Sequence, residues 1–356
     1  MKLETLLPLG KVDPGLREPA VPFDLQTIGS EALKVESLGY DNVMFEETKY
    51  DPYIAMALAA NATQTVGIGT AVAIAFPRSP AVTAMSAWTI QALSGGRFTL
   101  GLGTQVRAHI ERRFGLKWSA AGPWIREYVL AVKEIWRAWQ CSEQPNFSGQ
   151  HYNINLSVPL FDPGPIEFPD IPIHLAAVKP FMCRVAGEVA DGLRPHPVCT
   201  ADYIQNVMWP AVRKGATNEN RDVDDFSMSI KPLIATAPDE DQLQHKIRDI
   251  RARVAFYAST PAYRPAFAHH GLGDLADKLK LLSRAQKWEE MPKFISDEVL
   301  NQYACVGTYD EITGILARRY KDVVTHCEFS IPVSTPEDHK TLREMVVALR
   351  STKPQR

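Results

Sequence analysis

Three side chains that can exchange protons stand at or after the ends of apolar runs in this sequence. Glu47 and Asp51 come at and after the end of DNVMFEE, and His109 lies within RAHIERR. Carboxyl and imidazole groups are common general acids and bases in enzymes. The two carboxylates could instead cap the next helix or pair with Lys49 or Arg78, and His109 could be solvated or ion-paired. Both interpretations stay open for Glu47, whereas the second is favoured for Asp51 and His109.

Two backbone patterns could bind a ligand. The segment Ala176–Lys179 precedes Pro180, which has the placement of a first helical residue. The N–H groups at a helix start, together with the charge of Lys179, can bind an anion, although every helix has such a start. Gly69 lies inside the apolar segment GTAVAIAF, where a glycine indicates either close approach of a ligand or tight packing.

The elements that must position these residues are predicted by apolar periodicity. Strands are expected at 2–8, 41–47, 65–76, 97–104, 171–178, 192–196, 226–236 and 322–332. Helices are expected at 23–38, 51–63, from 80, from 123, 179–192, 200–214, 239–256 and from 335. Ser79 before Pro80 and Thr335 before Pro336 have the form of helix caps.

Eight strands, each followed by a helix, predict a (β/α)8 barrel. We expect a single TIM-barrel domain over residues 1–356, with excursions at about 104–122, 141–170 and 257–320. A doubly wound sheet is less well supported because no glycine-rich nucleotide turn follows the first strand. In a barrel the strands end at a common mouth, so the polar residues just past each strand are the candidates for function.

Composition limits the function classes. The chain has 356 residues, 45% of them hydrophobic and 22% charged, and a net charge of -2, so neither a nucleic acid nor a membrane is expected as a partner. Five cysteines without a C-x-x-C pair favour a reducing, cytoplasmic location. No spacing typical of metal ligands occurs, so we expect no metal.

Several longer segments resemble the bacterial luciferase-like monooxygenase superfamily over roughly residues 2–350. They are GTAVAIAFPRSPAVTAMSAWTIQALSGGRFTLGLGT, starting at Gly69, and AGEVADG at 186–192. FYASTPAYRPAFAHHG at 256–271 and ISDEVLNQYACVGTYDEI at 295–312 are similar to the branch of oxidoreductases that depend on coenzyme F420, the 8-hydroxy-5-deazaflavin.

The resemblance implies an oxidoreductase that transfers a hydride between coenzyme F420 and a small organic substrate. It implies a flavin-like ring across the barrel mouth, a phosphate held after the fifth strand, and a non-prolyl cis peptide at or beside Ala71–Val72. The cofactor-binding residues that it implies are Ala71, Val72, Gly103, Thr104, Ala176, Ala177, Val178 and Lys179.

The sequence departs from its sugar-phosphate dehydrogenase relatives, which carry a histidine after strand two and a glutamate after strand four. Glu47 is left as the proton-transfer candidate, with Thr48 and Gln105 as hydrogen-bonding partners. A partly apolar substrate pocket is expected above the ring. The residues proposed for that pocket are Tyr53, His109, Tyr257 and Tyr263.

Two other functions remain open. The same fold could use reduced FMN and molecular oxygen as a monooxygenase, or it could bind a flavin or deazaflavin without catalysis. Members of the superfamily are commonly dimers or larger, so we expect a homo-oligomer, a dimer, with the apolar second and third helices at its interface. The substrate remains undefined at this point.

Overall fold

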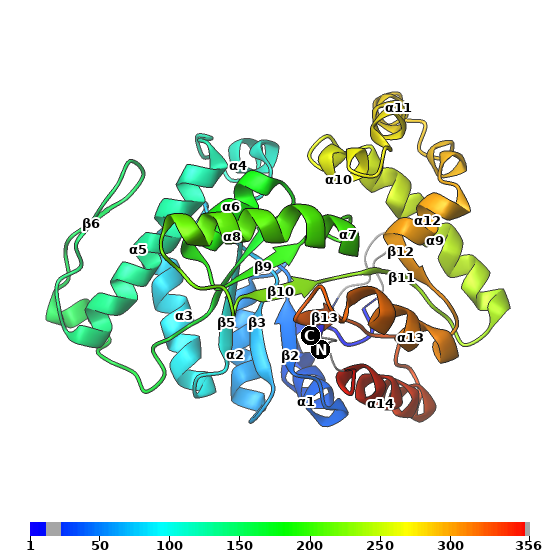
Figure 1. Cartoon of the computed structure of the whole chain (residues 1–356). Helices are drawn as coiled ribbons and strands as arrows, with labels where there is room; N and C mark the ends of the chain where they lie inside the picture. The colour runs from blue at the N-terminus through cyan, green and yellow to red at the C-terminus, as the bar shows by residue number, and fades with distance from the viewer. Residues whose placement is uncertain (12–22, 353–356) are drawn as a thin grey trace.

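A computed structural model describes residues 1–11 and 23–352 of the chain (Figure 1). Nine strands of this part form one sheet, in the order β3-β2-β1-β13-β10-β9-β8-β5-β4, and β3 also pairs with β5. The members are β1 (Lys2–Leu6), β2 (Asn42–Phe45), β3 (Gly67–Thr70), β4 (Ala73–Ile74), β5 (Phe98–Gly103), β8 (Ile173–Ala177), β9 (Gly192–Pro195), β10 (Ser227–Ile230) and β13 (His326–Glu328).

Closure of this sheet makes the barrel. Every pairing in it is parallel, and the β3–β5 pairing closes the ring. Since β3 and β4 both pair with β5, they act as one interrupted strand, and the nine strands supply eight positions. The predicted (β/α)8 barrel is therefore confirmed.

Helices follow the strands and surround the barrel (Figure 1). They are α1 (Ile28–Leu38), α2 (Pro52–Ala62), α3 (Pro80–Ser94), α5 (Ala121–Cys141), α6 (Pro180–Val189), α8 (Trp209–Asn218), α13 (Tyr309–Tyr320) and α14 (Pro336–Arg350). Local signals start them as expected: Ser79 accepts a hydrogen bond from Val82 at the start of α3, and Thr335 forms a capping box at the start of α14.

The excursions contain further elements. Helix α4 (Arg107–Arg112) follows β5, and a hairpin of β6 (Phe147–Ser148) and β7 (Asn153–Ile154) follows α5. The longest excursion runs from β10 to α13. It contains β11 (Leu233–Ala235), α9 (Glu240–Ala258), α10 (Arg264–Ala268), α11 (Gly273–Arg284), α12 (Asp297–Tyr303) and β12 (Ala304–Val306).

Three predicted elements need correction. The strand expected at 226–236 is two strands, because the chain leaves the barrel at Lys231-Pro232 and β11 pairs with β12 instead. The helix expected at 239–256 is α9, which packs against β11, α11 and α12 within the excursion, and α13 takes the position beside α14. The helix expected at 200–214 begins as α7 (Ala201–Tyr203), passes through a π-helical turn at Ile204–Met208 and continues as α8 to Asn218.

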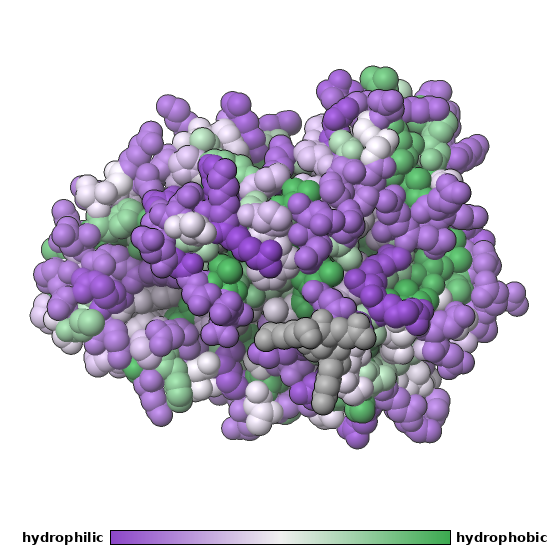
Figure 2. Space-filling view, viewed as in Figure 1, coloured by the Kyte–Doolittle hydropathy of each residue, from purple (hydrophilic) through white to green (hydrophobic). Residues whose placement is uncertain are grey.

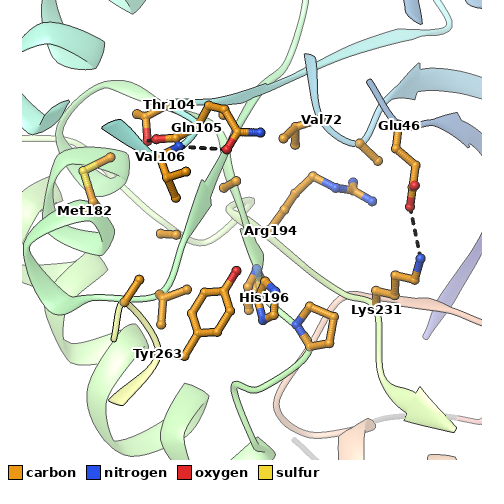
Figure 3. Close-up of a pocket in the computed structure, with 18 of the residues that line it drawn as sticks. Glu46, Val72, Thr104, Gln105, Val106, Met182, Arg194, His196, Lys231 and Tyr263 are labelled. Atoms are coloured by element: carbon orange, nitrogen blue, oxygen red, sulfur yellow. Dashed lines mark hydrogen bonds and ion pairs between the residues drawn. The ribbon is translucent and has the colours of Figure 1, made fainter. Parts of the chain in front are cut away.

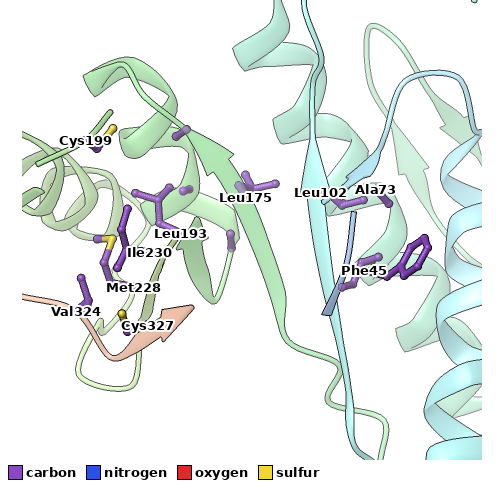
Figure 4. Packing of buried hydrophobic residues seen from close by; sticks show 14 of the residues in the cluster. Phe45, Ala73, Leu102, Leu175, Leu193, Cys199, Met228, Ile230, Val324 and Cys327 are labelled. Atoms are coloured by element: carbon purple, nitrogen blue, oxygen red, sulfur yellow. The ribbon is translucent and has the colours of Figure 1, made fainter. Parts of the chain in front are cut away.

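The two faces of the barrel strands differ in chemistry. Leu102, Leu175 and Leu193 stand in register on β5, β8 and β9 and belong to the hydrophobic core that packs on the helices (Figure 4). The inner face carries charge instead. Buried Glu4 of β1 pairs with buried Arg194 of β9, and these strands are not neighbours, so the contact crosses the barrel interior.

The surface agrees with the composition. The face seen in Figure 2 is largely hydrophilic, with separated hydrophobic patches rather than a continuous band. Within residues 1–11 and 23–352, no helix combines the length and the apolar character needed to cross a membrane.

Candidate active site

A cavity of about 590 Å³ lies at the C-terminal ends of the barrel strands. The predicted residues that line it are Glu47, Thr48, Ala71, Val72, Gly103, Thr104, Gln105, Ala176, Ala177, Val178, Lys179, Tyr257 and Tyr263. We call this space the mouth cavity. It brings together side chains from the ends of seven barrel positions and from α9, so its shape depends on closure of the barrel.

One wall of the mouth cavity is built from small residues. Ala71–Val72 is a non-prolyl cis peptide, at the position expected from the sequence resemblance. Gly103 at the end of β5 lies against this bond, and a Cβ there would come within 2.7 Å of Cγ2 of Val72. Ala176 of the neighbouring β8 completes the wall. The wall therefore exposes backbone and short side chains to the cavity.

A helix start faces the same cavity. Lys179 is the N-cap of α6, Pro180 follows it, and no side chain caps this end. The Lys179 side chain is exposed. The hydroxyl of Tyr203 donates a hydrogen bond of 3.1 Å to the carbonyl oxygen of Val178 and so holds the turn before α6 in place. Positive helix ends of this kind bind anions.

Glu47 is held by an ion pair. Nη1 of Arg78 lies 3.0 and 2.8 Å from its two carboxylate oxygens, and the backbone N–H of Ile74 donates to Oε2 at 2.6 Å. Arg78 also pairs with Asp51 at 2.9 Å, and Asp51 caps α2. Ion pairing was left open for Glu47 and favoured for Asp51, and the structure shows it for both carboxylates. The Arg78 guanidinium and the backbone N–H of Ile74 thus already occupy the Glu47 carboxylate.

Thr48 and Gln105 both line the mouth cavity, and neither side chain forms a hydrogen bond with Glu47. Gln105 adopts a left-handed backbone conformation with φ of 57°, and its Oε1 accepts a hydrogen bond from the N–H of Val106 at 2.8 Å. Figure 3 shows Thr104, Gln105 and Val106 on the side of the cavity opposite Glu46 and Lys231. The side-chain oxygen of Gln105 thus supports its own turn.

Two residues expected in the substrate pocket lie elsewhere. Tyr53 is buried on α2, and the guanidinium carbon of Arg78 lies 5.2 Å from the centroid of the Tyr53 ring. His109 is exposed on α4. Neither residue is among those that line the mouth cavity. Tyr53 packs in the hydrophobic core, and the buried residue of α4 is Ile110 rather than His109.

A charged cluster that sequence reasoning did not assign lies in the cavity. Nζ of Lys231 lies 3.1 Å from Glu46 and 3.7 Å from Glu328, and Nζ of Lys11 lies 2.6 Å from Glu46. Burial favours the neutral acid, but the ammonium groups of Lys231 and Lys11 lower the pKa of Glu46 to about 2. The cluster therefore contains one carboxylate that stays ionised.

The second carboxyl group of this cluster behaves differently. Burial raises the pKa of Glu328 to about 7, although Lys231 opposes the rise, and the nearby carboxylates of Glu4 and Glu46 add to it. A carboxyl group that is half protonated near neutral pH can both donate and accept a proton. Glu328 is thus the mouth residue best suited to acid–base chemistry.

His196 provides a neutral ring in the same cavity. Its imidazole stacks on Tyr263 with centroids 4.0 Å apart and meets Tyr257 edge-on at 4.8 Å. Burial, reinforced by the charge of Lys231, lowers the pKa of His196 to about 3. Figure 3 shows His196 beside Tyr263, with Arg194 between this pair and Glu46. His196 therefore acts as a neutral hydrogen-bonding and packing group.

The sequence contained signals for these unassigned residues. Arg194 and His196 stand at the end of the predicted sixth strand, and Glu328 interrupts the apolar run of the eighth strand. A polar residue inside a strand that reads as buried points to the barrel interior or mouth. The protonation state of Glu328 could not be predicted from the sequence. Its pKa is set by Glu4 on β1 and by Glu46 and Lys231, which follow β2 and β10.

Comparisons with known proteins agree with the geometry. A family model described as "Luciferase-like monooxygenase" matches residues 1–326. An uncharacterized protein of Mycobacterium tuberculosis is 38% identical over 305 residues, covering 86% of this chain and 90% of that protein. A putative coenzyme F420-dependent oxidoreductase of the same species is 28% identical, covering 78% of this chain and 82% of that protein.

Solved structures show the same fold. The coenzyme F420-dependent tetrahydromethanopterin reductase of Methanopyrus kandleri superposes with a TM-score of 0.72 at 18% identity, over 99% of this chain and 98% of that chain. EDTA monooxygenase of Chelativorans sp. BNC1 superposes with a TM-score of 0.70 at 15% identity, over 99% and 95%. Because the two scores are nearly equal, the fold does not distinguish a reductase from a monooxygenase.

Proposed function

Because this chain belongs to the luciferase-like monooxygenase family, we propose that it is an oxidoreductase that uses coenzyme F420 to transfer a hydride to or from an organic substrate. The mouth cavity is the reaction site in this proposal. The cofactor supplies the hydride chemistry, and the protein supplies binding, orientation and proton transfer.

The observation that carries the proposal is the small-residue wall beside an uncapped helix start. A planar tricyclic ring can lie against Ala71–Val72 and Gly103, because these residues present backbone and short side chains to the cavity. An anionic group on the cofactor would be held by the turn Ala176–Lys179 and the start of α6. The residues present therefore fit a flavin-like group with a phosphate.

The relatives favour the deazaflavin over FMN. One relative that is 28% identical is a putative coenzyme F420-dependent oxidoreductase. A flavin that activates oxygen is the alternative, and the fold similarity to EDTA monooxygenase keeps it testable. We place the deazaflavin first because the cavity also contains an acid–base group, which a hydride transfer to a carbonyl or imine carbon needs.

Glu328 is the proposed proton-transfer residue. It lines the cavity, it is next to Lys231, and its raised pKa allows it to hold a proton near neutral pH. Lys231 and Arg194 provide positive charge for a substrate oxygen or carboxylate in the same space. Glu47 then has a supporting role, since its ion pair with Arg78 holds the loop after β2 against the loop after β4.

The test is a turnover assay with two cofactors. Purified protein is mixed with oxidised F420 and a panel of alcohols, and with reduced F420 and a panel of enones and imines, while the visible absorption of the coenzyme is followed. A parallel assay measures oxygen consumption with reduced FMN. Coenzyme-linked turnover without oxygen uptake supports the proposal. Oxygen-dependent product formation with FMN alone would replace it by a monooxygenase function.

A further inference from the structure

Three side chains that can ligate a metal converge outside the mouth cavity: Asp202, His269 and His270. Their candidate ligand atoms all lie within 4.8 Å of one another. Asp202 belongs to α7, directly after the sixth barrel strand, whereas the histidines follow α10 in the long excursion. The cluster therefore joins the barrel to a segment that is 67 residues away in sequence.

The surroundings already orient these groups. Oδ2 of Asp202 is 2.5 Å from Nε2 of His269, and its Oδ1 accepts a hydrogen bond from the Asn206 amide at 2.7 Å. Nε2 of His270 is 2.8 Å from the hydroxyl of Thr200. Metal-binding histidines and carboxylates commonly use their second polar atom in this way. Asn206 thus holds the Asp202 carboxylate and Thr200 holds the His270 ring, and a bound ion would replace the hydrogen bond between Asp202 and His269.

We propose that Asp202, His269 and His270 bind one zinc ion and that the ion fastens the long excursion over the mouth cavity. Two imidazole nitrogens and one carboxylate oxygen are a ligand set that suits zinc, with water at the fourth position. Zinc–ligand bonds of about 2.0–2.1 Å place tetrahedral ligand atoms roughly 3.3 Å apart. The candidate atoms lie within 4.8 Å of one another, so the wider separations must shrink by up to about 1.5 Å. The 2.5 Å contact between Asp202 and His269 must widen by about 0.8 Å.

The position of the cluster explains why it would affect the cavity. Tyr263, which lines the cavity and stacks on His196, lies six residues before His269 in the same segment. Tyr203, next to Asp202, contacts the His269 ring at 5.3 Å and bonds to Val178 in the turn before α6. A bound ion would thus tie the segment that carries Tyr263 to the wall that faces it.

Zinc titration of metal-free protein tests the site. Isothermal titration calorimetry with zinc chloride should give one site per wild-type chain. Asp202→Asn, His269→Gln and His270→Gln should each weaken zinc binding at least tenfold, since loss of a group that only supports a metal ligand already weakens metal binding about 10–100-fold. His245→Gln is the matched control, because His245 is exposed on α9 of the same excursion. This variant should bind zinc as the wild type does.

Hydrogen exchange of residues 257–272, with and without zinc, tests the fastening. Zinc should slow exchange in the wild type and in His245→Gln, and it should have no effect in His269→Gln. Melting curves of each variant confirm folding before the comparison. The metal site is refuted if wild type binds no zinc at millimolar concentration, or if the three ligand variants bind it as tightly as wild type. Tight zinc binding that leaves hydrogen exchange of residues 257–272 unchanged refutes the proposal that zinc fastens the long excursion over the mouth cavity.

Discussion

Nζ of Lys231 lies 3.7 Å from Oε1 of Glu328, and both side chains line the mouth cavity. Lys231 stands just past β10, and Glu328 is the last residue of β13, so two neighbouring strand ends create the contact. Glu4, Glu46 and Arg194 also act on Glu328. This arrangement gives a carboxyl group whose charge changes near neutral pH, and the first two predictions depend on it.

The activity should follow the protonation of Glu328. If this group donates the proton during substrate reduction, kcat should fall above pH 7, because the pKa of about 7 leaves it ionised there. Glu328→Gln should lower kcat by about 10²–10⁴-fold and remove that inflection. A pH–rate profile of both proteins makes the measurement. If the pH–rate profile of Glu328→Gln kept the inflection near pH 7, the inflection would belong to another group.

The same group should influence stability. Its pKa in the folded chain is raised above the ordinary value of 4.5, so the folded state binds more protons between those values, and stability falls as pH rises from about 4.5 to 7. Above pH 7, Glu328→Gln should therefore raise the free energy of unfolding by about 1–3 kcal/mol. Urea unfolding at pH 5 and pH 8 measures this difference. An equal gain in the free energy of unfolding at pH 5 and pH 8 would contradict the raised pKa of Glu328.

Glu47 should behave as a structural residue. Glu47→Gln weakens the ion pair with Arg78, which lies at a largely buried position, so the free energy of unfolding should fall by about 1–3 kcal/mol. The pH inflection near 7 should persist in this variant. Glu337→Gln, in an exposed pair with Lys340, is the control and should change stability by less than about 0.5 kcal/mol. Loss of the inflection in Glu47→Gln would return the proton transfer to Glu47.

Lys179 should contribute to cofactor affinity. Lys179→Ala removes the positive charge at the start of α6, so the dissociation constant for F420 should rise about tenfold, equivalent to about 1.4 kcal/mol. The loss should shrink at high salt because exposed charges are screened. Lys287→Ala, an exposed lysine of the long excursion, is the control. Equal affinities of both variants would place the cofactor phosphate elsewhere.

We propose that the chain forms a dimer through α2 and α3. Exposed apolar side chains gather on these adjacent helices: Ile54 is 65% and Met85 is 56% exposed, and Leu58 and Val82 accompany them. Met85→Glu should shift sedimentation velocity from a dimer to a monomer. Val347→Glu is matched, since Val347 is 62% exposed on α14, and it should leave the dimer intact. A wild-type monomer, or a dimer in Met85→Glu, rejects this interface.

The barrel could be predicted because its signals are local. Apolar runs marked the strands, and caps such as Ser79 with Pro80 marked the helix starts, so each strand–helix unit was recognisable alone. The exit of the chain at Lys231-Pro232 was not recognised, because the apolar run continues into β11. Only the three-dimensional pairing of β11 with β12 divides that run.

The site was predictable in position and less so in chemistry. The rule that function gathers at strand ends placed Gly103 and Val178 at the mouth cavity. It could not decide between catalysis and ion pairing for Glu47, because that choice depends on the distance to Arg78. It also missed Glu328, whose pKa is set by burial and by residues from other strands.

The most direct test of the central claim is a calorimetric titration of metal-free, cofactor-free protein with F420 and, separately, with FMN. The account predicts one micromolar or tighter F420 site per chain and at least tenfold weaker binding of FMN. Binding should weaken in Lys179→Ala and persist in Lys287→Ala. Tighter binding of FMN than of F420 would contradict the account and assign the mouth cavity to oxygen-using flavin chemistry.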